Sequence, residues 1–442
     1  MRVELLMFFL GAGLWVTGCS EDGPAFIDGR FTAAEWDKIS RFTPLEPPPA
    51  SPTNRYADDA AAAAFGQRLW FEKRYAGAIT VAGTPENGGL GAAGETGKIS
   101  CADCHDPRHW FIDTRSIPND LSLGSSRTKR NSPSLVNAVY YDWAGWAGAH
   151  DQLWKQGASV PESKESFNGN RLRFVHVIYE HYRADYDALF PVPLDPALDP
   201  SAGGADRFPP NGRPKAAGAA DGPWEAMAEA DRAIVNTIMA NSGKALEAYE
   251  RLLVSANAPF DRYVAGDRHA LSESAKRGLQ LFIGKAACDS CHQDQTFTDN
   301  TFHNTGVVQA AMPYDDGRYG DVLRLTDTFN GAGVYSDDRE AGAAKLAGIQ
   351  QTEDLKGQFR TKSLRHVAMT APYFHDGSLA TLDAVVRFYN EGGGAASFPG
   401  TKDPRMVPLN LSEQEIQDLV AFLESLTGEP VPDHLQIDTA AP

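Results

Sequence analysis

The chain has 442 residues, which is enough for two or three domains that each bury a core of their own. Its formal net charge of −17 argues against nucleic acid as a partner and favours contacts with basic protein surfaces. The 41 glycines and 28 prolines predict long loops rather than a compact repeat.

The N-terminus is typical of an export signal. Residues Leu5 to Val16 form an apolar run that is too short to span a bilayer as a helix. The run leads into Val-Thr-Gly-Cys19, which resembles the lipobox of bacterial lipoproteins. We predict a signal peptide over 1–18, lipidation of Cys19 and a Pro-rich tether over 19–57. An ordinary cleaved signal with Cys19 incidental is the alternative; either predicts a periplasmic protein, and the first adds an anchor in the outer membrane.

Helical signals and loops then alternate. The pattern predicts a helix from Asp58 to Phe71, a Gly-rich loop over 76–98 and a second helix from Arg171 to Phe190. Residues 191–223 are rich in Pro, Gly and Ala, which indicates a surface insertion. A long helical stretch follows from Glu225 to Leu253, and we expect a break in it at Ser242-Gly243.

The last third of the chain repeats this layout. Ser272 can cap a helix that runs to Phe282. Ser412 and Glu415 form a capping box that opens a terminal helix, and Gly428 follows the end of that helix. Since no run of residues is typical of a hydrophobic strand, we predict a mainly α fold with long loops.

Four of the five cysteines lie in two Cys-x-x-Cys-His motifs. The motifs are Cys101, Cys104 and His105, and Cys288, Cys291 and His292. In such a motif the two thiols add to the vinyl groups of a haem and the His becomes the proximal iron ligand. A redox dithiol would not need the His, and a four-Cys zinc site would leave both His unexplained. The sequence therefore predicts two covalently bound c-type haems.

Each motif follows a predicted helix, so we expect two cytochrome c-like domains that each hold one haem. The N-terminal domain is predicted over 58–265 and the C-terminal domain over 266–430. A tail covers 431–442.

Segments of both halves resemble a known family in the same order. Residues 271–306 and 361–390 are similar to the C-terminal half of bacterial di-haem cytochrome c peroxidases and of MauG. Residues 101–113 and 127–148 are similar to the N-terminal half. The resemblance implies that peroxide reacts at the haem of His105, whereas the haem of His292 transfers electrons.

The resemblance also implies a second ligand for the haem of His292. In the family this ligand lies fourteen residues after the His of a His-Asp-Gly motif, which is His375 here, and the matching residue is Tyr389. Peroxidases of the family usually have Met at this position, and MauG has Tyr. A phenolate favours higher oxidation states of iron than a thioether does. A packing role for Tyr389 is the alternative. His375 and His303 belong to family motifs near the haem edge and are expected to form hydrogen bonds locally or to the haem propionates.

Other positions match the family around the first haem. The loop that carries a second His ligand in many resting peroxidases matches 117–126, which contains no His, so we expect an open distal face. Trp146 matches the Trp between the haems, and Trp143 is the alternative. The resemblance assigns proton transfer at the distal face to Glu165, with Glu162 second. The Gln and Pro that precede this Glu in the family match Gln156 and Pro161 approximately.

The family also carries a calcium ion between its domains. The residues that match its ligands are Asn131, Thr370 and Pro372. An amide oxygen and two carbonyls suit Ca²⁺, with water completing the shell. The alternative is that Asn131 only caps the turn before Pro133.

Three functions remain open. The first is reduction of H₂O₂ with electrons from a small donor protein, a c-type cytochrome or a cupredoxin. The second is a MauG-like oxidation of Trp or Tyr in a partner protein, which Tyr389 and the missing loop His favour. The third is a non-enzymatic di-haem electron carrier without a vacant iron site. We take the first as the prediction.

Overall fold

The structure is a computed structural model that describes residues 26–81, 88–115, 121–309, 314–394 and 398–442. The predicted signal peptide and Cys19 lie outside these residues. The described part is mainly helical, as predicted, and its one sheet pairs β1 Phe302–His303 with β2 Phe359–Arg360. No helix in it has the length and apolarity needed to cross a membrane.

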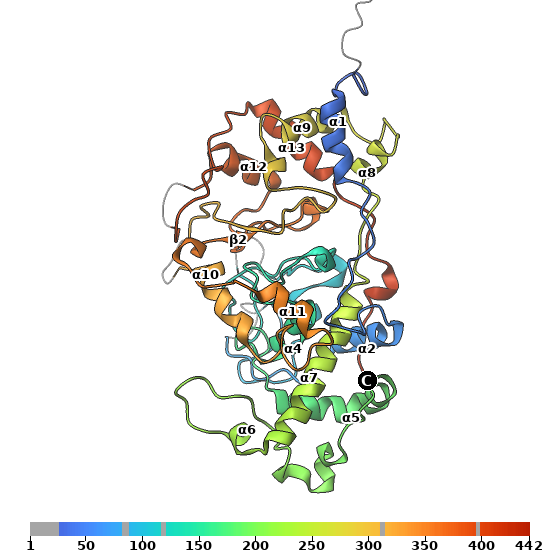
Figure 1. The fold of residues 1–442 in the computed structure, drawn as a ribbon, viewed down its shortest axis with the longest axis vertical. Helices are drawn as coiled ribbons and strands as arrows, with labels where there is room; N and C mark the ends of the chain where they lie inside the picture. The colour runs from blue at the N-terminus through green and yellow to red at the C-terminus, as the bar shows by residue number, and fades with distance from the viewer. Residues whose placement is uncertain (1–25, 82–87, 116–120, 310–313, 395–397) are drawn as a thin grey trace, which may run out of the picture.

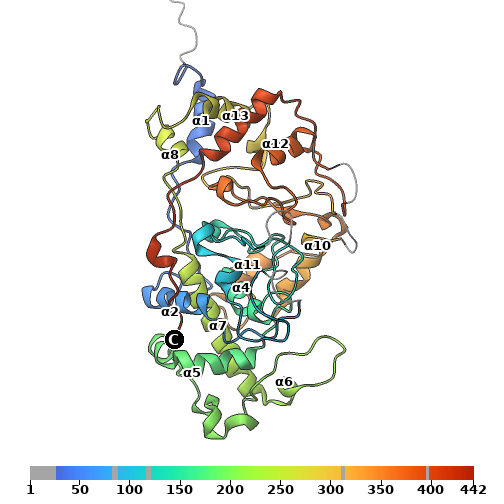
Figure 2. The same ribbon diagram turned by 180° about the vertical axis from the view of Figure 1, so that it is seen from behind.

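The helices gather into two halves, which Figures 1 and 2 show one above the other. The lower half contains α2 Ala60–Phe71, α3 Cys101–Cys104, α4 Leu153–Ser159, α5 Arg171–Leu189, α6 Pro223–Ala226 and α7 Glu229–Glu250. The upper half contains α1 Ala33–Ile39, α8 Pro259–Val264, α9 Glu273–Ile283, α12 Leu382–Asn390 and α13 Glu413–Glu424. Two short helices, α10 Arg318–Asp321 and α11 Arg339–Leu346, complete the set. Each half has its own hydrophobic core.

The same kind of helix crossing organises both halves. In the lower half α2 packs on α7, and a Cβ added to Gly66 would lie 1.9 Å from the carbonyl oxygen of Ala245. In the upper half α9 packs on α13, and a Cβ added to Gly278 would lie 1.9 Å from the carbonyl oxygen of Asp418. Only glycine lets the backbones approach this closely, so the two halves solve the same packing problem in the same way.

Replacing Gly278 by Ala should therefore destabilise the protein. The added methyl group overlaps main-chain atoms that cannot move cheaply, and overpacking of this kind costs about 1–3 kcal/mol. Denaturant unfolding measures the loss. Gly320→Ala is the matched control, because a Cβ there meets nothing within 4 Å and should change the free energy of unfolding by less than about 0.5 kcal/mol. Equal losses in both variants would contradict the close approach.

Most predicted helices are confirmed within a residue or two. The helix from Asp58 becomes α2 with Asp59 as its cap, and Ser272 and Ser412 cap α9 and α13. The predicted break at Ser242-Gly243 is wrong, because α7 is continuous through it. A Cβ on Gly243 would lie 2.3 Å from the carbonyl oxygen of Trp154, so this glycine serves the crossing of α4 and α7.

The segment predicted as a tether is folded from residue 26 onward, which corrects that prediction. Phe31, Ile39 and Phe42 are buried in the core of the upper half. The guanidinium of Arg365 donates to the carbonyl of Phe42 at 3.0 Å. Residues 26–42 therefore contribute to the upper half, and the chain then runs to the lower half, where the side chain of Asn54 donates to the carbonyl of Lys244 at 3.0 Å.

The C-terminal residues return to the lower half (Figure 1). Val431 and Leu435 are buried in its core. The side chain of Gln67 donates to the carbonyl of His434 at 2.9 Å, and Arg74 donates to the carbonyl of Ala441 at 3.0 Å. The residues predicted as a tail thus run from the upper half to the lower half and pack against α2.

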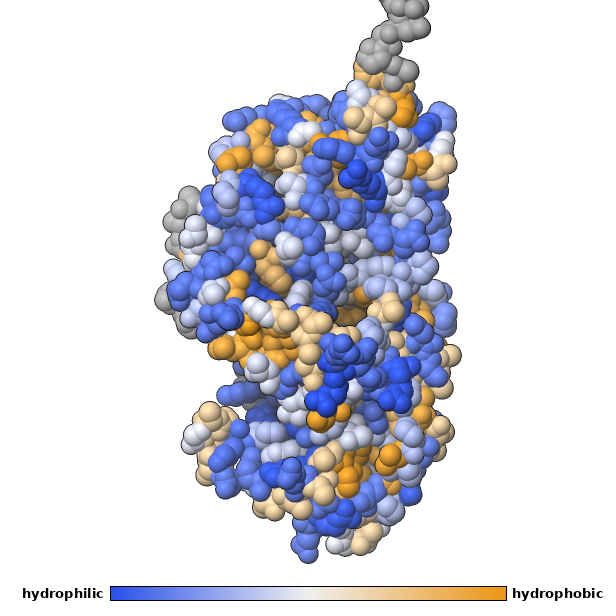
Figure 3. All heavy atoms as spheres, viewed as in Figure 1, coloured by the Kyte–Doolittle hydropathy of each residue, from blue (hydrophilic) through white to orange (hydrophobic). Residues whose placement is uncertain are grey.

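Residues 191–223 extend over the far end of the lower half (Figures 1 and 2). Arg207 attaches them to α7 through an ion pair of 2.7 Å to Asp231 and forms a second pair of 2.9 Å to Asp195 within the segment. The face shown in Figure 3 is largely hydrophilic, with apolar residues gathered in patches. Val334 and Leu323 are among the exposed large apolar side chains.

Candidate functional site

The first Cys-x-x-Cys-His motif lies at the start of a short helix. Ser100 and Asp103 form a capping box around α3, so the chain turns sharply at the two cysteines. Both cysteines are free rather than disulfide-bonded. The Nδ1 atom of His105 lies 3.1 Å from the carbonyl oxygen of Phe111, which fixes the ring and leaves Nε2 as the atom available to a metal.

The second motif is built in the same way. Cys288 and Cys291 are free, and the Nδ1 atom of His292 lies 2.9 Å from the carbonyl oxygen of Phe297. A His that binds a metal through one ring nitrogen usually donates a hydrogen bond from the other nitrogen to a carbonyl or carboxylate, which orients the ring. The two motifs therefore present the same donor arrangement, one in each half.

The electrostatics of both motifs fit a haem better than the alternatives. Burial lowers the pKa of His105 and of His292, which keeps the imidazoles neutral as a metal ligand requires. Burial raises the pKa of Cys104 and of Cys288 to about 12, whereas a reactive redox dithiol has a lowered pKa. In the described ranges the only clustered metal-binding side chains are Cys291, Asp299 and His303, so the two cysteine pairs do not meet in a zinc site.

A cavity of about 300 Å³ adjoins the second motif. It is lined by Cys288, Cys291, His292 and Tyr389, and on other sides by Trp146, His303, Arg360, Lys362 and His375. Apolar and aromatic side chains such as Phe282, Val386 and Leu419 share the walls with basic residues such as Arg360 and Lys362. Such a space suits a flat, mostly apolar cofactor with polar substituents.

Tyr389 reaches this cavity from α12. Thr381 caps the helix, and the ring of Tyr389 lies near those of Phe374 and Phe388, at centroid distances of 6.3 and 5.5 Å. Burial raises the pKa of the phenol, and the thiols of Cys288 and Cys291 add to the effect. The phenol is therefore neutral at physiological pH unless a cation binds its oxygen.

Trp146 and Trp143 have different surroundings. Trp146 lines the cavity, and its indole N–H donates to the carbonyl of Asn131 at 2.7 Å. Trp143 is absent from the cavity wall and lies between two cations instead, 4.6 Å from Arg318 and 5.2 Å from Lys345. Of the two, only Trp146 borders the space beside the second motif.

Asn131, Thr370 and Pro372 all line the same cavity. The amide nitrogen of Asn131 donates to the carbonyl of Pro372 at 3.2 Å, and the main-chain N–H of Asn131 donates to the carbonyl of His375 at 2.7 Å. The three residues come from the two halves of the chain. The contact therefore joins the segment after the first motif to the His-Asp-Gly segment.

The residues matched to proton transfer are placed unequally. Glu165 is exposed, and its side chain has no ion pair among the described residues. Glu162 is held by Arg171 in a two-pronged ion pair, with the shorter distance 2.6 Å. Gln156 lies on α4, partly buried, and Pro161 is buried. The loop 117–126 is described only from residue 121.

Three cations that the sequence analysis did not single out face the two motifs. Arg360 and Arg115 each bury two guanidinium nitrogens that have no hydrogen-bond partner, and Lys362 lines the cavity. Another guanidinium nitrogen of Arg115 lies 3.4 Å from the sulfur of Cys104. Arg115 also forms an ion pair of 3.3 Å with Asp113, whereas Arg360 and Lys362 have no carboxylate partner among the described residues. Buried cations without an anion fit a cofactor that brings its own carboxylates, as haem does. In the sequence, Arg360 and Lys362 are two basic residues on either side of Thr361, and this pattern is too common to predict a binding site for carboxylates.

A buried carboxyl group also lies near the first motif. Burial, and then the neighbouring Glu247, raise the pKa of Glu250 to about 8. Burial, and then Glu250, raise the pKa of Cys101 in the first motif. Glu250 lies in a segment whose sequence predicts a helix, and an acidic residue in such a segment is normally expected to face solvent. The sequence therefore did not indicate a buried carboxyl group here.

A second aromatic contact joins the halves. The indole of Trp110 stacks on the imidazole of His366 at a centroid distance of 5.3 Å and an angle of 19°. Trp110 precedes Phe111, whose carbonyl holds His105, whereas His366 lines the cavity of His292. The regions around the two motifs are therefore in contact through the stacked rings of Trp110 and His366, in addition to the hydrogen bonds of Asn131.

Comparison with known proteins agrees with this site. The sequence model of a family described as di-haem cytochrome c peroxidase matches residues 60–269. The cytochrome-c peroxidase IdrP1 of Denitromonas iodatirespirans is 34% identical over 405 residues, which cover 88% of this chain and 87% of that protein. The methylamine utilization protein MauG of Methylorubrum extorquens is 30% identical over 357 residues, which cover 78% and 80%.

A solved structure shares the fold. It is described as a MauG-like protein associated with microbial copper homeostasis, and it superposes with a TM-score of 0.60 at 24% identity over 89% of this chain and 97% of the other. Mainly helical architecture and paired haem-attachment motifs define the class as that of c-type cytochromes with an oxidoreductase function. Within this class, the chain belongs to the family of di-haem cytochrome c peroxidases and MauG.

Proposed function

We propose that this protein is a di-haem peroxidase that reduces H₂O₂ to two waters at the site of His105, with two electrons relayed from the site of His292. The asymmetry of the two sites carries the proposal. Tyr389 lines the cavity of His292, whereas residues 117–126 offer no His to a ligand position at the first site. His105 would hold the haem whose iron reacts with peroxide, and His292 with Tyr389 would hold the haem whose iron transfers electrons.

The domain arrangement is part of the proposal. We assign one haem to a cytochrome c-like domain over 58–265 and the other to a domain over 266–430. The two separate cores and the repeated glycine-mediated helix crossing support this division. Mass spectrometry of the purified protein tests it, because two covalent haems should be found, one on the peptide of Cys101 and Cys104 and one on that of Cys288 and Cys291.

Trp146 is proposed to pass electrons between the two sites. Its indole borders the cavity of His292 and is fixed by the hydrogen bond to Asn131, so its orientation is set by the fold. Asn131 belongs to the segment that follows the first motif. The indole of Trp146 is thus held in one orientation, beside the site of His292 and hydrogen-bonded to the segment that follows the motif of His105. This position suits a residue that passes electrons between the two sites.

Glu165 is proposed to move the proton between the two peroxide oxygens, and Gln156 is proposed to assist it. Its carboxylate is unpaired and free to exchange a proton, whereas the carboxylate of Glu162 is committed to Arg171. Glu165→Gln should lower peroxide turnover by about 10²–10⁴-fold, the usual range for loss of a general acid or base. Steady-state assays with reduced cytochrome c measure it.

Glu162→Gln is the comparison for that variant. It should leave turnover nearly intact and instead lower thermal stability, since Arg171 loses its anionic partner. The reverse pattern, a large loss of turnover in Glu162→Gln alone, would move the assignment to Glu162.

A calcium ion is proposed at Asn131, Thr370 and Pro372. The Asn131 amide already lies against the carbonyl of Pro372, and a rotation of the amide would turn its oxygen to a cation held there. Prolonged treatment with a chelator should then perturb the absorption of both haems, because the three residues line the cavity and join the halves. Added Ca²⁺ should restore the spectrum and added Mg²⁺ should not. A spectrum indifferent to chelation would contradict the site.

The MauG-like oxidation and the non-enzymatic electron carrier can be tested with the same purified protein. Tyr389 favours a MauG-like enzyme that oxidises Trp or Tyr of a partner protein, because a phenolate ligand stabilises high oxidation states. A long-lived charge-resonance band in the near infrared after H₂O₂ supports that function. Rapid turnover with reduced cytochrome c and no such band supports the peroxidase. A non-enzymatic carrier would show neither.

The cellular setting is proposed from the sequence. We infer export to the periplasm, a lipid on Cys19 in the outer membrane, and a small c-type cytochrome or cupredoxin as electron donor. The net charge of −17 suits a donor with a basic face. Cys19→Ser should release the protein from the membrane fraction into the soluble periplasmic fraction. Release of the unsubstituted protein without detergent would contradict the anchor.

A further inference from the structure

Two buried or partly buried cations at the cavity of His292 have no acidic partner. Arg360 is 3% exposed, and its Nε and one Nη have no hydrogen-bond partner. The remaining Nη lies 3.5 Å from the carbonyl oxygen of Gly145. Within the described residues, the ammonium of Lys362 forms neither a hydrogen bond nor an ion pair. Most other buried cations of this protein have carboxylate partners, as Arg365 has in Asp261 at 3.0 Å.

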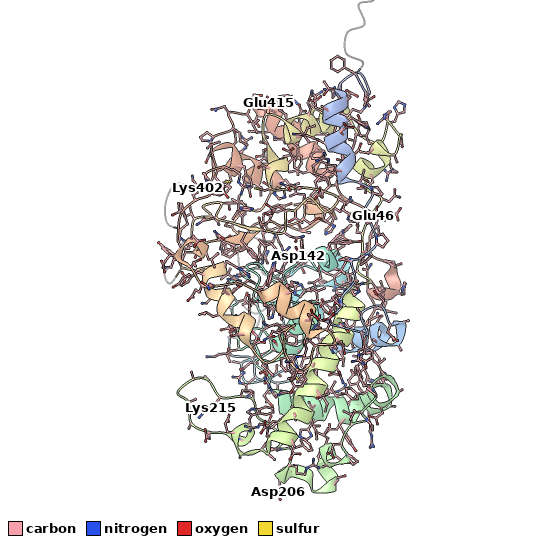
Figure 4. All side chains as sticks on the ribbon, in the orientation of Figure 1. Glu46, Asp142, Asp206, Lys215, Lys402 and Glu415 are labelled. Atoms are coloured by element: carbon pink, nitrogen blue, oxygen red, sulfur yellow. The ribbon has the colours of Figure 1, made fainter. Side chains whose placement is uncertain are left out.

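Aromatic rings flank both cations. The guanidinium carbon of Arg360 lies 3.4 Å from the ring centre of Tyr141, and Lys362 Nζ lies 4.7 Å from that of Trp146. Ring faces attract cations but leave their N–H groups without acceptors. Asp142, the acidic residue that follows Tyr141, is exposed at the level between the two halves (Figure 4). Among the described residues, neither cation has a carboxylate partner that would offset its desolvation cost.

The position of the pair is fixed by main-chain contacts. The N–H of Arg360 in β2 donates to the carbonyl of Trp146 at 2.8 Å, and β2 pairs with β1 next to His303. Both side chains line the cavity together with Cys288 and His292. They therefore lie on the side of the cavity that faces Trp146.

We propose that Arg360 and Lys362 are a carboxylate-binding pair for the two propionates of the haem held by Cys288, Cys291 and His292. The inference rests on the proposed function in so far as that function places a haem in this cavity. Haem carries two carboxylates, and Arg360 and Lys362 are two cations at this cavity that lack a carboxylate partner among the described residues. A guanidinium binds a carboxylate through two parallel hydrogen bonds, and an ammonium binds as a point charge.

The pairing also matters for Trp146. Loss of an electron from the indole creates positive charge 4.7 Å from the Lys362 ammonium, and an unpaired ammonium opposes that. A propionate bound to Lys362 cancels the repulsion. The carboxylate pair thus positions the haem and keeps the proposed relay oxidisable, so Lys362 and Arg360 are positioning residues rather than catalytic ones.

Lys362→Met and Arg360→Gln test the proposal in the holoprotein. Each variant leaves one propionate without its cation, which stabilises ferric iron, so the midpoint potential of the His292 haem should shift to lower values in a spectroelectrochemical titration. The propionate bending band of the same haem in resonance Raman spectra should move to lower frequency. Lys362→Arg should restore both readings. Lys356→Met is the matched control, because Lys356 is paired with Glu353 at 2.7 Å away from the cavity.

The outcomes separate this inference from the proposed function. Unchanged potential and propionate band in Lys362→Met, with both haems attached, would overturn the carboxylate pair and leave the peroxidase untouched. A shift confined to the haem of His105 would overturn it as well. A protein that carries only one covalent haem would contradict the proposed function instead. Lys362→Met keeps the aliphatic stem, so the result stands even if Arg360→Gln does not fold.

Discussion

Replacing Tyr389 by Phe should convert the haem of His292 from a six-coordinate low-spin state to a high-spin state. The phenol oxygen is the only atom removed, and Tyr389 reaches the same cavity as His292 from a capped helix. Absorption and EPR spectra of the resting protein measure the change. Tyr389→Met should keep a low-spin haem but raise its midpoint potential, because a thioether favours ferrous iron where a phenolate favours ferric.

Tyr373 provides a matched control for this prediction. It lines the same cavity, but its hydroxyl donates to the carbonyl of Val367 at 3.1 Å and is therefore engaged. Tyr373→Phe deletes the same atom from the same cavity and should leave the low-spin spectrum unchanged. If Tyr389→Phe also leaves that spectrum unchanged, Tyr389 packs against the haem without binding its iron.

Replacing Trp146 by Phe should slow electron transfer between the two sites by at least about tenfold, which corresponds to about 1.4 kcal/mol in the barrier. Phe fills much of the indole volume but is far harder to oxidise, and it cannot donate to the carbonyl of Asn131. Stopped-flow spectroscopy measures the rate at which the reduced haem of His292 is oxidised after peroxide is added.

Trp143→Phe separates a relay from a packing effect. Trp143 lies between Arg318 and Lys345, outside the cavity wall, and its indole would have to be oxidised next to two positive charges. This variant should transfer electrons at the unaltered rate. Equal slowing in both variants would indicate a general disturbance of the segment 143–146 rather than a route through Trp146.

Local signals in the sequence predicted the helices well because caps and apolar spacing are local properties. Asp59, Ser272 and Ser412 cap the helices as expected. The failure at Gly243 has a tertiary cause: its role depends on the carbonyl of Trp154, which is distant in sequence. The tether prediction failed for a similar reason, since Phe31 and Phe42 are buried only because the upper half offers them a core.

The candidate site was partly accessible from sequence. The two Cys-x-x-Cys-His motifs are contiguous, so their chemistry is readable, and the family resemblance pointed to Tyr389 and Trp146. Arg360 and Lys362 were not recognised, because a basic residue in a loop normally faces solvent. Their lack of partners becomes visible only when the segments from the two halves enclose one cavity.

EPR spectroscopy of the resting holoprotein tests the central claim of two unequal sites most directly. We expect a high-spin ferric signal from the haem of His105, which is open to peroxide, together with a low-spin ferric signal from the haem of His292, which is closed by Tyr389. Two low-spin signals without any high-spin component would leave no iron position for peroxide and would contradict the proposed enzyme.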